Sequence, residues 1–166
     1  MTMGLKGLVL LAVLSPTGRE NPEYTWWSSF NPGAWAKIRM EGIIEDRPFT
    51  LEQTQTLVAV SPEKVQVSRR GTLQIGGALL PGTKERDEVA REDDLALTIT
   101  AEGDETIVAA GIPLQSHRIE GTDPRTKARV KFWIVKDVPG GVVRGELCPE
   151  GSTSVTTITL VSWGRR

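Results

Sequence analysis

Few side chains in this sequence could carry out covalent chemistry. The chain has one cysteine, Cys148, and one histidine, His117, and such a pair could supply a thiolate nucleophile and its base. The two residues fall in different predicted strands, so we interpret Cys148 as an inert strand residue and His117 as a solvated side chain. A single cysteine also excludes an intramolecular disulfide, and one cysteine with one histidine cannot make a four-ligand zinc site.

Carboxylates offer more choice, because paired acids can act as general acid and base or as ligands of hard cations. One group consists of Glu41, Glu45 and Asp46, and a second lies within residues 83–94, where Arg86 and Arg91 interrupt it. Neither group has the spacing of a calcium loop, and no nucleophile elbow, phosphate loop or dinucleotide fingerprint occurs. We therefore expect a protein that is not an enzyme, with no metal site and no cofactor.

The overall charge gives no pull toward nucleic acid or anionic membranes, since 20 basic residues face 21 acidic ones. A basic patch could still form from Arg69, Arg70, Arg129, Lys131 and Arg144. Strand alternation sends Arg69 and Arg70 to opposite faces, so we expect no nucleic-acid partner. Trp133 is expected to pack at a sheet edge or against the opposite layer, and the alternative is an exposed side chain that stacks on a sugar or docks on a protein partner.

The largest store of apolar surface is the segment from Tyr24 to Trp35, which holds five of the nine aromatic residues. Residues 19–33 give the one persuasive helical signal, with Asn21 as N-cap and Pro22 at the first helical position. Tyr24, Trp27 and Phe30 would share a helix face, and Asn31-Pro32-Gly33 would end the helix. We expect a sheet that curves around this aromatic helix or is capped by it.

After Trp35 the hydrophobic period changes to two, which is typical of half-buried strands. The strands that we expect cover residues 35–44, 49–60, 64–75, 95–101, 106–110, 112–120, 127–136, 142–148 and 153–163. The first three are joined by short turns and should form an antiparallel meander, although Arg69 interrupts the apolar face of the third. Residues 76–94 have no such period and are predicted to be a surface loop, with a helical turn near residues 84–91 or, alternatively, a role as a lid over a cavity.

The N-terminal residues 1–18 have the outline of a signal peptide: Lys6, the apolar run Leu8–Leu14, and a Ser15-Pro16-Thr17-Gly18 break. The run is shorter than the about 20 apolar residues of a transmembrane helix, so no transmembrane span is expected. This predicts a periplasmic or secreted protein. The alternative is a cytoplasmic protein that begins with an ordinary strand or helix. Residues 19–166 suit a single antiparallel β domain.

Short motifs add a resemblance to known proteins. Pro32-Gly33-Ala34-Trp35 resembles the Pro-Gly-Ser-Trp opening of a group of uncharacterised exported bacterial β-proteins, and similar segments are Thr106–Gly111, Phe132-Trp133 and Val138–Val143. The architecture of that group is similar to the LolA-like half-barrel of periplasmic lipoprotein carriers. The resemblance implies a sheet curled about a helix, with an apolar concavity that takes lipid chains in the carriers, although the carriers contain more helix than this sequence predicts.

Together these patterns predict a mainly β fold: a curved antiparallel sheet of about nine strands, as a half-barrel or open barrel, with a short N-terminal helix. The preferred function is binding of a lipid or other apolar ligand in a cavity lined by Trp26, Trp27, Phe30, Trp35, Ile38, Met40, Val65, Val67 and Phe132. The alternative is a structural or protein-interaction module of the cell envelope, in which these side chains only fill the core. A continuous cavity would favour a ligand, whereas a closed core with an exposed apolar patch would favour a protein partner.

Overall fold

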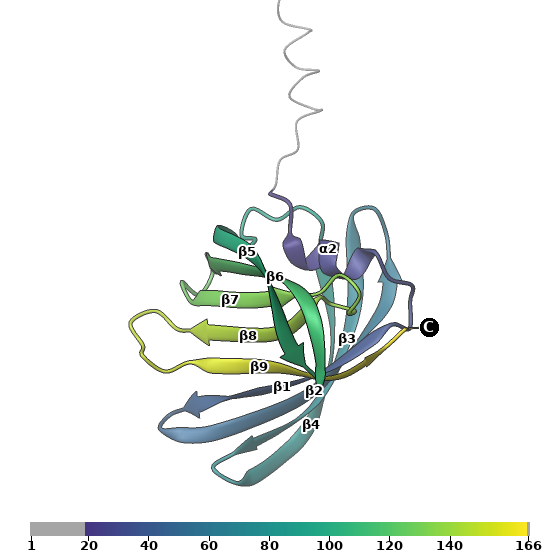
Figure 1. Ribbon diagram of the computed structural model, residues 1–166. Helices are drawn as coiled ribbons and strands as arrows, with labels where there is room; N and C mark the ends of the chain where they lie inside the picture. Colours follow the sequence, from purple (N-terminus) through teal and green to yellow (C-terminus); the bar gives the residue numbers. More distant parts are fainter. Residues whose placement is uncertain (1–18, 166) are drawn as a thin grey trace, which may run out of the picture.

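The computed structural model describes residues 19–165, so the predicted signal segment, residues 1–18, lies outside the described residues. In the described part the chain forms one short helix and nine strands (Figure 1). These elements are α2 (Pro22–Ser28), β1 (Trp35–Ile44), β2 (Arg47–Val60), β3 (Lys64–Ile75), β4 (Ala78–Ala90), β5 (Thr98–Ala109), β6 (Ile112–Thr122), β7 (Arg129–Ile134), β8 (Val142–Cys148) and β9 (Thr156–Gly164). The predicted fold class, a mainly β protein with a short N-terminal helix, is confirmed.

All nine strands belong to one antiparallel sheet with the order β4-β3-β2-β1-β9-β8-β7-β6-β5. β1 pairs with both β2 and β9, so it joins two meanders, β1 to β4 and β5 to β9. The predicted meander of the first three strands is therefore confirmed. The sheet stays open, because β4 and β5 lie at its two edges although they are consecutive in the chain. Residues 91–97, here called the strap, connect these two edges.

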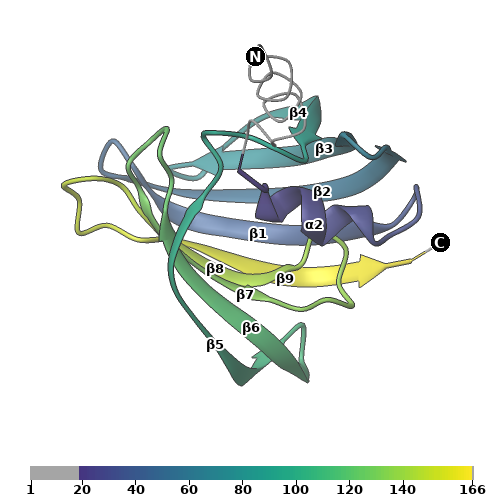
Figure 2. The ribbon, with the colours of Figure 1, turned by 90° about the horizontal axis from the view of Figure 1, so that it is seen from above.

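The sheet bends around α2, which lies over its concave face (Figures 1 and 2). Register shifts interrupt several ladders, including those at Lys37/Ile38 between β1 and β9 and at Trp133/Ile134 between β7 and β8. An extra residue in one strand increases the local bend and twist of a sheet. The curvature that makes room for the helix thus has a local cause in both meanders.

Helix α2 begins as the sequence predicts, but it is shorter than residues 19–33. The Asn21 side chain accepts a hydrogen bond from the Glu23 amide at 3.1 Å, and Pro22 is the first helical residue. The helix ends at Ser28, and the Phe30 amide donates to the Trp27 carbonyl at 3.1 Å in a tighter turn. Gly33, with a φ of 96°, then turns the chain into β1, a conformation that glycine adopts without a steric cost.

Trp27 anchors the helix to the sheet. Its side chain is 1% exposed, and it belongs to a core cluster with Leu57 of β2, Val65 and Val67 of β3, and Val89 of β4. Tyr24 and Phe30 pack against the same cluster, as their predicted common face requires. The Tyr24 hydroxyl also donates to the Ser61 carbonyl at 2.8 Å. A buried Trp removes a large apolar area from water, and this contact holds α2 on the concave face.

Trp133 is buried, with 5% of its surface exposed. Its strand, β7, lies between β6 and β8, and long polar side chains from its neighbours cover the ring. The indole Nε1 donates to Glu105 Oε1 at 2.8 Å, and the Arg144 guanidinium lies 4.7 Å from the ring centroid. Trp133 is thus a packed structural residue, and the alternative of an exposed docking or stacking side chain is wrong.

The predicted loop over residues 76–94 is also wrong, because residues 78–90 form the edge strand β4. Only Val89 of this strand is buried. Because neither face of β4 is buried along most of its length, its sequence does not alternate between apolar and polar residues, and this alternation is the signal that predicts a strand. Its Lys84, Glu85 and Pro81 are features that discourage pairing with another chain at a sheet edge. The other edge strand, β5, runs unbroken from Thr98 to Ala109, where two separate strands were expected.

His117 lies on β6 and faces two carboxylates of the edge strand β5. Its Nδ1 is 2.6 Å from Asp104 Oδ1, and its Nε2 is 2.8 Å from Glu102 Oε2. Hydrogen bonds to Asp104 and then to Glu102 raise the pKa of His117 above its ordinary value of 6.5. The imidazolium therefore links β5 to β6 from the solvent side, and both of its ring nitrogens are engaged.

The first prediction concerns Gly140, whose φ is 72°. A Cβ built there would lie 2.6 Å from Cζ2 of Trp27, so Gly140→Ala should displace the anchor of α2. Gly77→Ala is the matched control, since Gly77 has a φ of 83° and nothing within 4 Å of its would-be Cβ. We expect Gly140→Ala to lower the free energy of unfolding by about 2–4 kcal/mol, against about 1–2 kcal/mol for the control. Equal losses in urea denaturation would show that the Trp27 contact is not tight.

The second prediction concerns pH. Because the folded pKa of His117 is raised, its contacts stabilise β5 fully below pH 6.5 and lose that effect as the pH rises through the folded pKa. We expect an NMR titration of the His117 ring to show a pKa above 6.5 and Asp104→Asn to lower it. Asp46→Asn, at the distant β1–β2 turn, should leave the titration unchanged. An unshifted pKa in the unmodified protein would contradict the linkage.

Candidate functional site

A partly open cavity of about 290 Å³ lies between α2 and the concave face of the sheet. Its apolar wall is built from side chains of five elements: Trp26 of α2, Ile38 of β1, Val130 and Phe132 of β7, Leu147 of β8, and Ile158 of β9. Alternating positions of curved strands direct these side chains to the same face. The cavity is thus lined by both meanders and closed on one side by the helix.

Trp26 and Phe132 form an aromatic pair in this wall. Their ring centroids are 6.1 Å apart with an interplanar angle of 76°, an edge-to-face arrangement that aromatic pairs favour. Gly141 lets the chain pass close behind Trp26, because a Cβ on Gly141 would lie 3.0 Å from Cγ of the indole. These contacts fix the indole of Trp26 at the boundary between the helix and the cavity.

Four of the predicted cavity residues line this space: Trp26, Trp27, Ile38 and Phe132. The other five lie elsewhere. Val65 and Val67 are fully buried beneath Trp27, and Phe30 packs against the same cluster. Met40 packs against a second core cluster, and Trp35 lies against Gly164. The part that any of the nine plays in binding a ligand stays a prediction.

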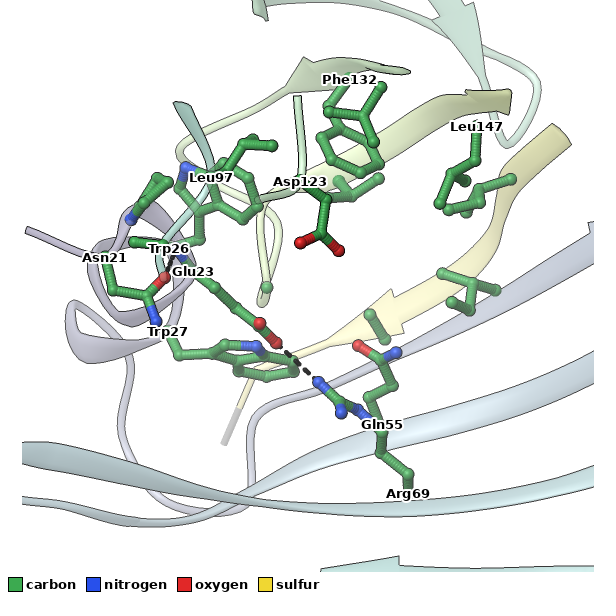
Figure 3. A pocket seen from close by; sticks show the side chains of 18 of the residues that line it. Asn21, Glu23, Trp26, Trp27, Gln55, Arg69, Leu97, Asp123, Phe132 and Leu147 are labelled. Carbon is green, nitrogen blue, oxygen red and sulfur yellow. Dashed lines mark hydrogen bonds and ion pairs between the residues drawn. The ribbon is translucent and has the colours of Figure 1, made fainter. Parts of the chain in front are cut away.

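Polar side chains line one side of the cavity (Figure 3). Arg69 of β3 reaches up from the sheet, where its Nη2 lies 2.6 Å from Glu23 Oε1 at the start of α2. A second carboxylate, Asp87 of β4, pairs with Nη1 of the same guanidinium. The arginine that interrupts the apolar face of β3 in the sequence therefore connects the sheet to the helix. Burial of a charge at such a position requires partners, and two acids supply them.

Asp123, in the turn between β6 and β7, projects its carboxylate into the cavity from the opposite side (Figure 3). Its Oδ1 accepts a hydrogen bond from the Arg125 amide at 2.8 Å and so shapes the turn. Among residues 19–165, no lysine or arginine pairs with this carboxylate. Sequence analysis did not single out Asp123. Its place in the Gly121-Thr122-Asp123-Pro124 segment predicts a turn, but it does not predict that the carboxylate lines a cavity.

The strap, residues 91–97, covers part of the opening and contributes Leu95 and Leu97 to the lining. Backbone hydrogen bonds attach it to the start of the helix, from the Asn21 amide to the Arg91 carbonyl at 2.8 Å and from the Asp93 amide to the Arg19 carbonyl at 2.7 Å. The backbone N–H of Leu95 and then the Arg125 guanidinium lower the pKa of Asp93, which therefore stays ionised. The strap is thus attached both to the helix start and, through Arg125, to the β6–β7 turn.

The structure does not bring the cysteine and the histidine together. His117 is on β6 and Cys148 is at the end of β8, with β7 between these strands. The Cys148 thiol donates to the Ser152 carbonyl at 3.0 Å. Among the described residues, no three His, Cys, Asp or Glu side chains are grouped so that they could hold a metal ion.

Within residues 19–165, none of the helical structure has the length and apolar character needed to cross a bilayer.

Comparisons with known proteins give a likeness in fold only at low identity. No protein-family model matches the sequence, and no curated protein matches it. A candidate exported protein with a YmcC-like fold from Bacteroides fragilis superposes with a TM-score of 0.44 at 8% identity, covering 82% of this chain and 97% of its own. MucB superposes with a TM-score of 0.39 at 10% identity, covering 87% of this chain and 57% of its own.

Proposed function

We propose that this protein is a non-catalytic, exported β domain that binds a lipid chain or another apolar small molecule between α2 and the sheet. The observation that carries the proposal is the cavity of about 290 Å³ with its continuous apolar wall from Trp26 to Ile158. Cavities that bind small molecules are typically concave and largely apolar, with a few convergent polar groups. The export part of the proposal rests on the apolar run Leu8–Leu14 that follows Lys6.

Burial of apolar surface is the proposed source of affinity. At roughly 25 cal/mol per Å², a chain that buries about 300 Å² gains about 7 kcal/mol before the costs of association. The wall is preorganised, because Trp27 holds α2 on a fully buried part of the sheet and the strap is hydrogen-bonded to the helix start. Preorganisation lowers the entropic cost of binding, so a modest cavity can retain its ligand.

A second candidate function is a protein-interaction module of the cell envelope. It is favoured by large apolar side chains exposed at the ends of strands, with Ile43 58%, Leu79 66% and Val108 73% exposed. Ile43 and Leu79 lie near the β1–β2 and β3–β4 turns, whereas Val108 lies near the β5–β6 turn. These side chains are spread over separate hairpins, so they support a partner less directly than the cavity supports a ligand.

The third prediction tests the ligand proposal by filling the cavity. Leu147→Trp places an indole in the apolar wall, and Val161→Trp is the matched control, because Val161 is 36% exposed and does not line the cavity. We expect the unmodified protein and the control to bind the uncharged fluorophore N-phenyl-1-naphthylamine. Leu147→Trp should weaken that binding at least about tenfold, since lost apolar burial of about 1.4 kcal/mol already has this effect.

Circular dichroism should show that both variants retain the β spectrum. Equal affinity of Leu147→Trp and the unmodified protein would contradict the proposed site. If the unmodified protein bound no fluorophore but co-purified with a protein partner from the host envelope, the interaction module would replace the ligand proposal.

A further inference from the structure

We propose that the ligand of this cavity is a cationic amphiphile, with a protonated amine held by Asp123 and an apolar tail against Phe132 and Leu147. This inference rests on the proposed ligand-binding function and adds the chemical class of the ligand. It follows from the charges around the cavity and from Asp123, the one of the two lining carboxylates that has no cationic partner among the described residues.

When the ion-pair partners behind the lining are included, four carboxylates (Glu23, Asp87, Asp93 and Asp123) surround the polar side of the cavity with two arginines, Arg69 and Arg125. Arg69 supplies one positive charge, and it is already shared between Glu23, at 2.6 Å, and Asp87. Asp123 adds a further carboxylate across the cavity. Arg125 lines the cavity as well, but its guanidinium is turned to Asp93 and to the Leu95 carbonyl. A cation in this space would offset the excess, whereas an anion would increase it.

Asp123 has the acceptor capacity for an ammonium group. Its Oδ1 already accepts the Arg125 amide at 2.8 Å, but Oδ2 is free of that task, and a carboxylate has about four lone-pair sites. Figure 3 shows this carboxylate between the helix side of the cavity, with Glu23, and the wall that contains Phe132 and Leu147. Hydrogen bonds between an ammonium group and a carboxylate are among the stronger ones in proteins.

Gln55 of β2 offers a second acceptor on the sheet side. Its Nε2 donates to Gln53 Oε1 at 2.9 Å, which leaves the Oε1 of Gln55 to accept a hydrogen bond from a ligand. An ammonium group has three donors, so a donor remains for a second acceptor in the lining, such as Gln55, once Asp123 is bound. The apolar wall begins beside these acceptors, and this arrangement matches a molecule with one charged end.

An anionic ligand fits less well, although Arg69 lines the cavity. Nε of Arg69 has no hydrogen-bond partner, but this atom is shielded from solvent, so a molecule that enters from solvent does not reach it. The two terminal nitrogens already bond to carboxylates. An incoming carboxylate or phosphate would have to displace Glu23 or Asp87 and would leave that acid without its partner.

The fourth prediction compares three probes with the same ten-carbon tail: decylamine, decanol and decanoate, each below its micellar concentration at pH 7. The affinity of each probe is measured by its competition with N-phenyl-1-naphthylamine for the full chain. Alkylamines remain protonated at this pH, as lysine does. We expect decylamine to bind at least about tenfold more tightly than decanol, and decanoate to bind more weakly than decanol.

Asp123→Asn removes the charge but keeps an oxygen that can accept the Arg125 amide, so the turn should persist. This variant should abolish the preference for decylamine over decanol and leave the affinity for decanol unchanged. The matched control is Asp46→Asn, in the β1–β2 turn with a φ of 60°, a conformation that asparagine tolerates. It should preserve the preference.

Two outcomes would overturn the inference and leave the proposed function in place. In the first, decanol binds as tightly as decylamine, with no effect of Asp123→Asn. In the second, decanoate binds most tightly, which would assign the recognition to Arg69. If neither the fluorophore nor any of the three probes bound to the protein, both the inference and the proposed function would fail.

Discussion

The contact on which the rest of the structure depends is the burial of Trp27 against Val65 and Val67. Both valines are fully buried, and Trp27 is 1% exposed. This contact holds a seven-residue helix on the sheet, which a helix of that length could not achieve by its own stability. Gly140 completes the seat of the indole, since any side chain there would enter the space of Trp27. The position of α2 on the sheet then determines the position of the cavity.

The cavity exists because the two meanders diverge on either side of the helix. The half formed by β2, β3 and β4 packs closely against Trp27, whereas on the other side Trp26 contacts Phe132 of β7, and Leu147 of β8 and Ile158 of β9 line the cavity. Trp27 therefore anchors the helix in the core, whereas the preceding residue, Trp26, faces the cavity. The Arg69–Glu23 ion pair, 2.6 Å long, marks the boundary between these two regions. The strap then joins the two sheet edges across the helix start.

The sequence predicted the architecture where burial leaves a periodic pattern. Ile38 and Met40 alternate with Lys37 and Arg39 because one face of β1 meets the core, and the cap formed by Asn21 is a local interaction. β4 was missed because neither of its faces is buried along most of its length. The packing of Trp133 could be expected but not its partners, because these come from other strands, with Arg144 above its ring and Glu105 at its indole nitrogen.

The candidate site was less predictable than the fold, for the same reason. The aromatic segment pointed to the right helix, but the sequence could not separate Trp26, which lines the cavity, from Phe30, which packs in the core. Asp123 and Glu23 are 100 positions apart in the chain, and only the folded sheet brings both to one cavity. Long-range pairing of this kind leaves no local signal in a single sequence.

The space between α2 and the sheet is proposed to hold a small molecule in the natural protein. The most direct measurement is native mass spectrometry of the protein purified from its own host without detergent, followed by extraction and identification of any bound compound. We expect an added mass of one small amphiphile, which is lost from the Leu147→Trp variant and retained by Val161→Trp. A bare protein mass in all three samples, or an adduct that Leu147→Trp retains, would contradict it.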